Sequence, residues 1–233
     1  MLMNKGFEIN NKHTLDFGVK LKTRSIDLPV EKQIIDSVPY MNGNYNFSRA
    51  VGKACYENRE LKYTFLILRN KDVYDIENKK RKFLTWLYSL KINEKLYDYA
   101  TPRLYYKVTV KNINIVDNKG YCEIEVIFDA YPFKIDYKNG NTQKWDDFNF
   151  ETDVLQGYYE ITDSKTIKLV NNSMYDIKVN VISSATINIT LNTNNYIANI
   201  GTNKELFTLS KGENTLIIEG TGIIYFEWEE EVI

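Results

Sequence analysis

Apolar residues recur at helical spacing in one stretch near the middle of the chain. From Asp72 to Leu90 they return every three or four positions and form a single stripe along one side of a helix. The stripe contains Val73, Ile76, Phe83, Leu84 and Leu87. This spacing predicts one amphipathic helix at about residues 72–90, whose stripe needs a β-sheet to cover it.

The segments on both sides of this helix follow the two-residue period of β-strands. Glu60–Arg69 has a continuous apolar middle, which indicates a strand that is buried on both faces. Arg103–Phe133 predicts a long hairpin with its turn at Asp117–Gly120. A change of phase near Asn112 predicts a β-bulge in the first strand of this hairpin.

The helix and the hairpin together predict the core of an N-terminal β-sheet domain. Trp86 and Leu87 are expected to pack against the strand that ends at Phe128, with Phe83 on the same side of the helix. The hairpin ends at Pro132, where the character of the sequence changes. We therefore expect the domain boundary there.

Residues 134–233 show no helical periodicity. Short alternating segments are separated by turn clusters such as Lys138–Asn141, Asn192–Asn195 and Lys211–Asn214. Regular short strands of this kind predict a β-sandwich. The expected fold class is mainly β (β-rich α+β), with a helix-containing N-terminal β-sheet domain at 1–133 and a C-terminal sandwich at 134–233.

The first sixty residues resemble short strands joined by turns. Pro29 and Pro39 interrupt them, and Met41–Asn44 has turn chemistry. Proline in such segments favours edge strands or arms. An arm that leaves the core would suit contact with a neighbouring copy, and an ordinary loop-rich sheet edge fits the same pattern. In the first case, the contact residues would be Pro39, Tyr40, Tyr45 and Phe47.

Composition and charge exclude some classes of function. The net charge of the 233-residue chain is −1, whereas a nucleic-acid-binding protein needs a basic surface, so no nucleic-acid specificity is expected. No stretch approaches a membrane span or the apolar core of a signal peptide, which predicts a soluble protein made in the cytoplasm. The 18 tyrosines suit sheets and protein contacts, where a ring is buried and its hydroxyl stays hydrated.

Candidate catalytic and metal-binding groups are scarce. His13 is the only histidine, and it lies in a polar turn. Any Ser-His-Asp or Cys-His catalytic site would have to use this residue, because the sequence has no other histidine. Cys55 and Cys122 lack the partner spacing of a zinc site and are expected to be buried thiols. No enzyme activity, cofactor or metal is therefore expected.

Glu123 and Glu125 lie two residues apart on one strand and form a carboxylate pair. Lys107 and Lys111 are placed similarly on the facing strand. Cross-strand ion pairs with these lysines are a simpler interpretation than acid–base catalysis.

One group of aromatic residues suggests a sugar-binding platform. Trp145, Tyr158 and Trp228 would stack on a sugar, with Asp146 and Asp147 as hydrogen-bond acceptors. The alternative is that these residues belong to the core and rim of the sandwich. A glycosidase would need a second carboxylate opposite Asp146 or Asp147, and the sequence does not place one.

Several short motifs follow one another in an order that resembles the distal tail (Dit) proteins of bacteriophages. They are Gly6–Phe7, Asp16–Val19, Met41–Phe47, Phe83–Leu87, Lys95–Tyr99, Leu104–Val108, Phe128–Pro132 and Lys211–Gly220. Each is a few residues of turn or strand, so the resemblance depends on their order and spacing. It includes Tyr131 and Pro132 at the end of the hairpin.

This resemblance implies a structural role at the tail tip of the virion, after assembly in the cytoplasm of the bacterial host. The N-terminal domain would form a homohexameric ring, and the C-terminal domain would be a galectin-like sandwich. The ring would join the tail-tube protein to the tail-associated hub protein and the receptor-binding protein. Two alternatives remain, which are a carbohydrate-binding β-sandwich module for host surface polysaccharide and a hub component of a tail-derived bacteriocin.

Overall fold

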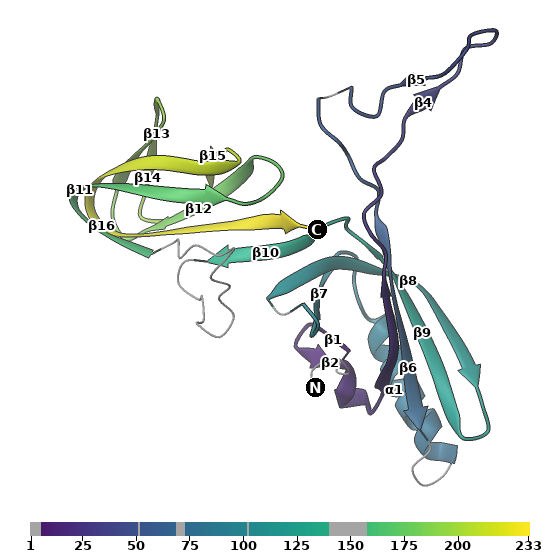
Figure 1. The fold of residues 1–233 in the computed structure, drawn as a ribbon. Helices are drawn as coiled ribbons and strands as arrows, with labels where there is room; N and C mark the ends of the chain where they lie inside the picture. Colours follow the sequence, from purple (N-terminus) through teal and green to yellow (C-terminus); the bar gives the residue numbers. More distant parts are fainter. Residues whose placement is uncertain (1–5, 51, 69–72, 102, 140–157) are drawn as a thin grey trace. The chain divides into compact units, whose positions relative to one another are not determined.

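The computed structural model describes residues 6–50, 52–68, 73–101, 103–139 and 158–233. The chain divides into two compact units, residues 1–134 with Ile233 and residues 135–232. Over these described residues the fold is mainly β with one α-helix, as the sequence predicts (Figure 1). The described part contains no helix that is long and apolar enough to span a membrane.

The first unit contains one long helix, one short 3₁₀ helix and a set of antiparallel strands. Its elements are β1 (Phe7–Ile9), β2 (Lys12–His13), the 3₁₀ helix (Thr14–Phe17), β3 (Lys20–Ile26), β4 (Ile35–Asp36), β5 (Tyr45–Asn46), β6 (Arg59–Leu68), α1 (Val73–Tyr88), β7 (Glu94–Asp98), β8 (Leu104–Asp117) and β9 (Tyr121–Ala130). The helix and the 104–130 hairpin agree with the sequence prediction.

The centre of this unit is a sheet in which β3, β6, β9 and β8 pair in that order, all antiparallel. The register between β8 and β9 shifts between Val110 and Asn112, which confirms the predicted bulge. On the far side of β8, β7 pairs with residues Tyr105–Val108, and β1 pairs with β7.

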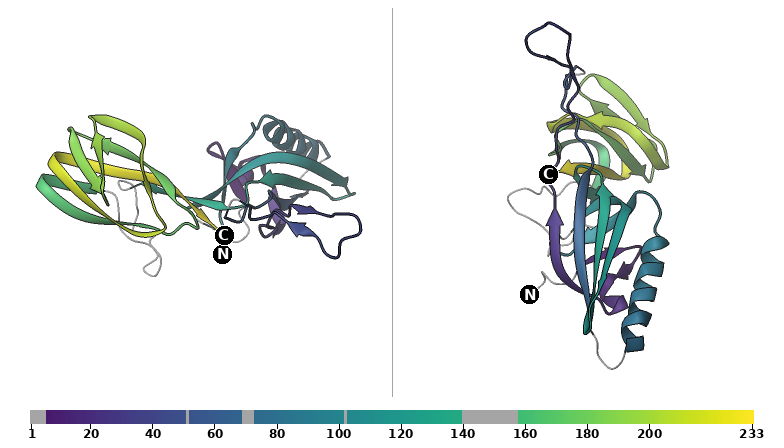
Figure 2. Two further views of the ribbon diagram at one scale, coloured as in Figure 1. Left: turned by 90° about the horizontal axis from the view of Figure 1, so that it is seen from above. Right: turned by 90° about the vertical axis from the view of Figure 1, so that its right-hand side faces the viewer.

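Helix α1 covers one face of this sheet (Figure 2, right). The rings of Phe83 and Phe65 are 5.3 Å apart, and Phe7 packs against Trp86 and Phe128 at centroid distances of 6.0 and 5.3 Å. The helix residues Phe83, Trp86 and Leu87 and the strand residue Phe128 are all buried. The core therefore forms where the apolar stripe of the helix meets the sheet.

Two expectations for β6 and the cysteines need correction. Residues along β6 alternate between buried and half-buried, so this strand is not buried on both faces. Cys122 is buried, but Cys55 is exposed because its segment belongs to a two-stranded ribbon that has no core beneath it. Tyr131 is 37 % exposed, and its neighbour Pro132 is buried.

The second unit is built from strands. They are β10 (Lys134–Asn139), whose first residue lies in the first unit, β11 (Tyr158–Asn171), β12 (Ile177–Ser183), β13 (Ile187–Leu191), β14 (Asn194–Ala198), β15 (Gly201–Leu209) and β16 (Gly212–Val232). Strand β16 is one strand of 21 residues and runs through glycines at 220 and 222.

Strand β16 continues through these glycines because they let it bend. Residues 216–219 pair with β13, residues 224–227 pair with β12, and β11 pairs along both segments. Gly220 and Gly222 lie between the two segments with φ of +136° and +154°, a backbone conformation that favours glycine. A Cβ on Gly222 would lie 2.9 Å from Ser184 Oγ, so close packing also requires a glycine there.

The core of the second unit lies among these strands. Buried side chains include Leu169, Val181, Ile189, Ile218 and Phe226. Trp228 is 2 % exposed and belongs to this core, and its Nε1 donates a hydrogen bond of 3.0 Å to Glu230 Oε1. Burial of its apolar ring with a satisfied N–H is the common arrangement for tryptophan in a protein core.

Candidate functional site

Residues 27–58, which we call the arm, form an extension of strands β3 and β6 beyond the central sheet (Figure 1). Glu57 N donates to Val30 O at 2.9 Å, and Lys32 N donates to Cys55 O at 2.8 Å. Farther out, β4 pairs with β5. The arm is therefore a two-stranded ribbon that starts at the edge of the sheet.

The arm exposes an unusual amount of apolar surface. Nine large apolar side chains within it are exposed, namely Leu28, Val30, Ile34, Ile35, Val38, Tyr40, Met41, Tyr45 and Phe47. A concentration of exposed apolar side chains on one segment is more typical of an interaction site than of ordinary protein surface. A two-stranded ribbon is a single layer, so it has no second layer of its own that could cover these side chains.

The tip of the arm is a tight turn that directs a tyrosine into solvent. Met41 N donates to Val38 O at 3.2 Å and closes the turn. Tyr40 has a φ of +66°, which is unusual for a residue with a bulky side chain, and its side chain is fully exposed. Backbone strain of this kind clusters at functional positions, so the tip is a candidate contact point.

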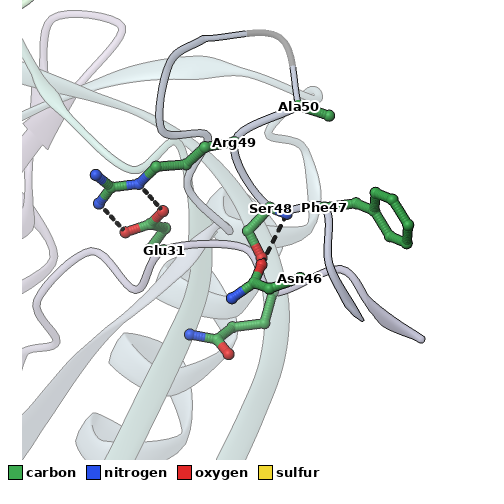
Figure 3. A pocket seen from close by; sticks show the side chains of 7 residues that line it. Glu31, Asn46, Phe47, Ser48, Arg49 and Ala50 are labelled. Atoms are coloured by element: carbon green, nitrogen blue, oxygen red, sulfur yellow. Dashed lines mark hydrogen bonds and ion pairs between the residues drawn. The ribbon is translucent and has the colours of Figure 1, made fainter. Parts of the chain in front are cut away.

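One side of the arm contains a cavity of about 530 Å³ (Figure 3). It is lined by Glu31, Gln33, Asn46, Phe47, Ser48, Arg49 and Ala50. Ser48 fixes its wall, because Ile34 N donates to Ser48 Oγ and Ser48 N donates to Asn46 Oδ1, both at 2.9 Å. The cavity is thus built by hydrogen bonds within the arm.

Arg49 and Glu31 form an ion pair at this cavity. The Nε and Nη2 atoms of Arg49 donate to the two carboxylate oxygens of Glu31, each at 2.8 Å. These hydrogen bonds lower the pKa of Glu31. Glu31 therefore stays ionised near neutral pH and is unsuited to general acid catalysis.

The central sheet has two open edges. In the registers of the described strands, β3 pairs with β6 alone. On the other side of β8, β7 pairs only with Tyr105–Val108, so β7 does not cover Val110–Asp117. Ile115 and Val116 on this segment are 41 % and 57 % exposed. Open edges of this type can pair with a strand of another chain.

The face of the sheet opposite the helix carries paired charges. Lys22 on β3 contacts Glu123 on β9 at 2.6 Å, and Glu60 on β6 contacts Lys111 at 2.6 Å and Lys62 at 2.9 Å. Ion pairs of Glu123 and Glu125 with Lys107 and Lys111 were expected from the sequence. That expectation was wrong for Glu123 and Lys111. Their ion-pair partners are Lys22 on β3 and Glu60 on β6, strands that are distant from the hairpin in sequence.

Four of the sequence-predicted site residues lie together on the arm. Pro39, Tyr40, Tyr45 and Phe47 all lie on the arm and are exposed. The exposed apolar residues beside them on the arm, Leu28, Val30, Ile34 and Ile35, were not predicted as contact residues from the sequence. Their alternation with polar residues gave a strand signal, but only the absence of a covering layer makes them surface residues.

The expected sugar platform is not supported for Trp228. This ring is in the core, so it cannot stack on a ligand in this structure. Tyr158 is 50 % exposed and packs against Tyr225 at 5.4 Å, and Trp145, Asp146 and Asp147 lie outside the described residues. Within the described ranges, no group of three or more His, Cys, Asp or Glu could hold a metal ion.

Comparison with known proteins gives a match in structure but not in sequence. No protein-family model and no curated protein matches the chain. The fold is that of a phage tail hub protein, which confirms the family resemblance of the sequence at the level of fold.

The solved structure that shares this fold is Dit (gp 19.1) of phage SPP1, which is described as a paradigm of the hub adsorption apparatus in phages that infect Gram-positive bacteria. It aligns with a TM-score of 0.64 and 9 % identity over 96 % of this chain and 98 % of that chain. The activated baseplate of phage p2 aligns with a TM-score of 0.46 and 9 % identity over 97 % of each chain.

Proposed function

We propose that this chain is a structural hub protein of a phage tail tip, or of a tail-derived bacteriocin, and that it acts by assembly into a ring. The observation that carries this proposal is the exposed apolar arm on a chain that shares its fold with a phage hub protein. An apolar surface of this kind is stable in water when a partner covers it.

The two open edges of the central sheet support a ring. Strand β3 and the outer part of β8 lie at opposite ends of the order β3-β6-β9-β8. Pairing of β3 in one copy with β8 in the next would be a heterologous, head-to-tail contact, and such contacts close into rings when the rotation between copies permits. Main-chain hydrogen bonds would supply the contact, and a homohexamer is the ring size that we propose.

The arm would reinforce this contact. Each copy would place its apolar side chains, including Tyr40 and Phe47, on its neighbour, and burial of such rings is a major source of interface stability. The cavity beside Arg49 would accept a side chain of the same neighbour. The arm and the edge would thus act in one interface.

In the virion, this ring would lie at the tail tip between the tail-tube protein on one side and the tail-associated hub protein and receptor-binding protein on the other, after assembly in the host cytoplasm. The role is structural, with no catalytic step. The carbohydrate-binding alternative has no supporting geometry in the described residues, because Trp228 is buried.

Association of the purified chain tests this proposal. Light scattering and negative-stain images at high protein concentration should show a ring for the natural sequence. The double variant Ile34→Ser, Tyr40→Ser should shift the chain to the monomer, because it removes two exposed apolar side chains of the arm. Tyr74→Ser is the matched control, since Tyr74 is 79 % exposed on α1 and should leave the ring intact. A natural chain that stays monomeric and does not bind a tail-tube protein would refute the proposal.

A further inference from the structure

Arg59 is a buried arginine at the base of the arm, where β6 begins. Only 4 % of the residue is exposed, and its guanidinium lies over the ring of Tyr106 at 5.0 Å. Its Nη1 donates a long hydrogen bond of 3.5 Å to Asp27 O. The Nε and Nη2 atoms are buried and have no hydrogen-bond partner among the described residues.

The buried acid Asp98 is already paired with another arginine. Arg24 Nη1 donates to Asp98 Oδ1 at 2.9 Å, and Ala100 N donates to the same oxygen. The hydroxyl of Tyr63 donates to Asp98 Oδ2 at 2.9 Å. Asp98 therefore has both oxygens occupied, so Arg24 has a carboxylate partner whereas Arg59 has none among the described residues.

A second cation lies near Arg59, and a buried hydroxyl lies near Tyr106. The positive charge of Arg59 lowers the pKa of Lys134, after the larger effect of burial, so the two cations are close enough to repel each other. Thr101 Oγ1 is buried and lies near the hydroxyl of Tyr106, the residue whose ring the Arg59 guanidinium covers. A buried guanidinium without a counter-charge is strongly unfavourable, and a second cation increases the penalty.

The geometry of the free donors indicates what would relieve this penalty. The Nε–H and one Nη–H of arginine lie on the same edge of a planar group and donate in parallel, which matches the two oxygens of a carboxylate. We propose that Arg59, with Lys134 and Thr101, forms a carboxylate-binding site at the base of the arm. The carboxylate would come either from a small organic acid in solution or from an Asp or Glu side chain of a second copy.

Binding of a free carboxylate at this site does not require a ring, so it can be tested on the dilute full-length chain. Thermal unfolding is measured in sodium acetate and in sodium chloride at equal ionic strength and pH 7. Acetate should raise the Tm of the natural chain in a saturable manner, because a ligand that binds only the folded state stabilises it. The Arg59→Met variant should lose this response. Its Tm in chloride should be at least as high as the Tm of the natural chain.

Two further variants separate the site from general effects of charge. Arg81→Met is the matched control, because Arg81 is an exposed arginine of the same unit that hydrogen-bonds to Asn78. It should keep the full acetate response. Arg59→Lys keeps the charge but loses the parallel donors, so its response should be much weaker than that of the natural chain.

The outcomes distinguish the two sources of the carboxylate and can overturn the site. If a second copy supplies it, acetate and Arg59→Met will both weaken self-association; if a free acid supplies it, association will not change. No acetate-specific increase of the Tm in the natural chain would overturn the site. Stabilisation by sulfate without stabilisation by acetate would overturn the carboxylate assignment. A monomeric chain that still responds to acetate would refute only the proposed ring.

Discussion

Arg49 and Glu31 join the two strands of the arm by a bidentate ion pair, with both donor–acceptor distances at 2.8 Å. The two residues are 18 positions apart in sequence and lie on opposite sides of the ribbon's turn. Both residues line the cavity whose side chains are drawn in Figure 3. The pair therefore connects the shape of the arm to the proposed interface.

Arg49→Met should weaken ring assembly while it changes the stability of the chain little. The Arg49 side chain is 69 % exposed, and an exposed ion pair contributes about 0–1 kcal/mol to folding. The interface should be more sensitive, because the arm loses a fixed geometry. Light scattering across a concentration series measures the association. Lys178→Met removes an equally exposed lysine that pairs with Glu205 in the second unit, and it should have no effect on assembly.

Phe83→Ala should strongly destabilise the first unit. Phe83 is fully buried between α1 and the sheet, and its ring contacts Phe17, Phe65 and Trp86. Loss of a buried phenyl ring costs about 3–5 kcal/mol. Hydrogen exchange of the β6 amides reports this unit separately. Tyr74→Ala, on the exposed side of α1, should change the free energy of opening derived from this exchange by less than about 0.5 kcal/mol. Similar losses of stability in both variants would contradict the described packing.

Gly222→Ala should destabilise the second unit more than Gly201→Ala. Both glycines have positive φ, at +154° and +96°, so both substitutions introduce backbone strain of about 1–2 kcal/mol. Only at Gly222 would the new Cβ approach Ser184 Oγ, at 2.9 Å, and disturb the hydrogen bond from Ile223 N to that oxygen. Urea unfolding of the two variants measures the difference. Equal midpoints would show that β16 does not need the close approach to Ser184.

The pKa of Glu60 should be about 2, far below its ordinary value of 4.5. Hydrogen bonds from Lys111 and then Lys62 lower this pKa, because they favour the ionised carboxylate. The folded state thus holds the proton less tightly than the unfolded chain, and the contribution of Glu60 to stability is present above pH 4.5 and lost as the pH falls toward 2.

A carbon-13 NMR titration of the Glu60 carboxyl group measures this pKa. In Lys111→Met, the pKa should move back toward 4.5 because the largest of its causes is removed. Thermal unfolding of Glu60→Gln should depend less on pH between 2 and 4.5 than that of the natural chain. An unshifted pKa in the natural chain would mean that the ion pairs on this face do not persist in solution.

Local patterns in the sequence determined the elements of the first unit. The apolar stripe predicted a helix at about 72–90, and α1 spans Val73–Tyr88, because helix formation depends on neighbours three and four residues away. The phase change near Asn112 predicted the bulge of β8 for the same reason, since a strand keeps its alternation unless a residue is inserted. The order of the short motifs also predicted the similarity in fold to a phage hub protein.

Tertiary structure decided which of these residues are covered and which partners they meet. Trp228 and Cys55 both lie in strand-like segments, yet the first is in a core and the second is on the bare ribbon of the arm. Glu123 pairs with Lys22, which is 101 residues away, and not with the lysines of its own hairpin.

The unpaired Nε and Nη2 of Arg59 were also invisible in the sequence. Periodicity specifies which face of an element is apolar, but strand order and the layers above and below specify burial and charge partners. Those depend on contacts between residues that are distant in the chain.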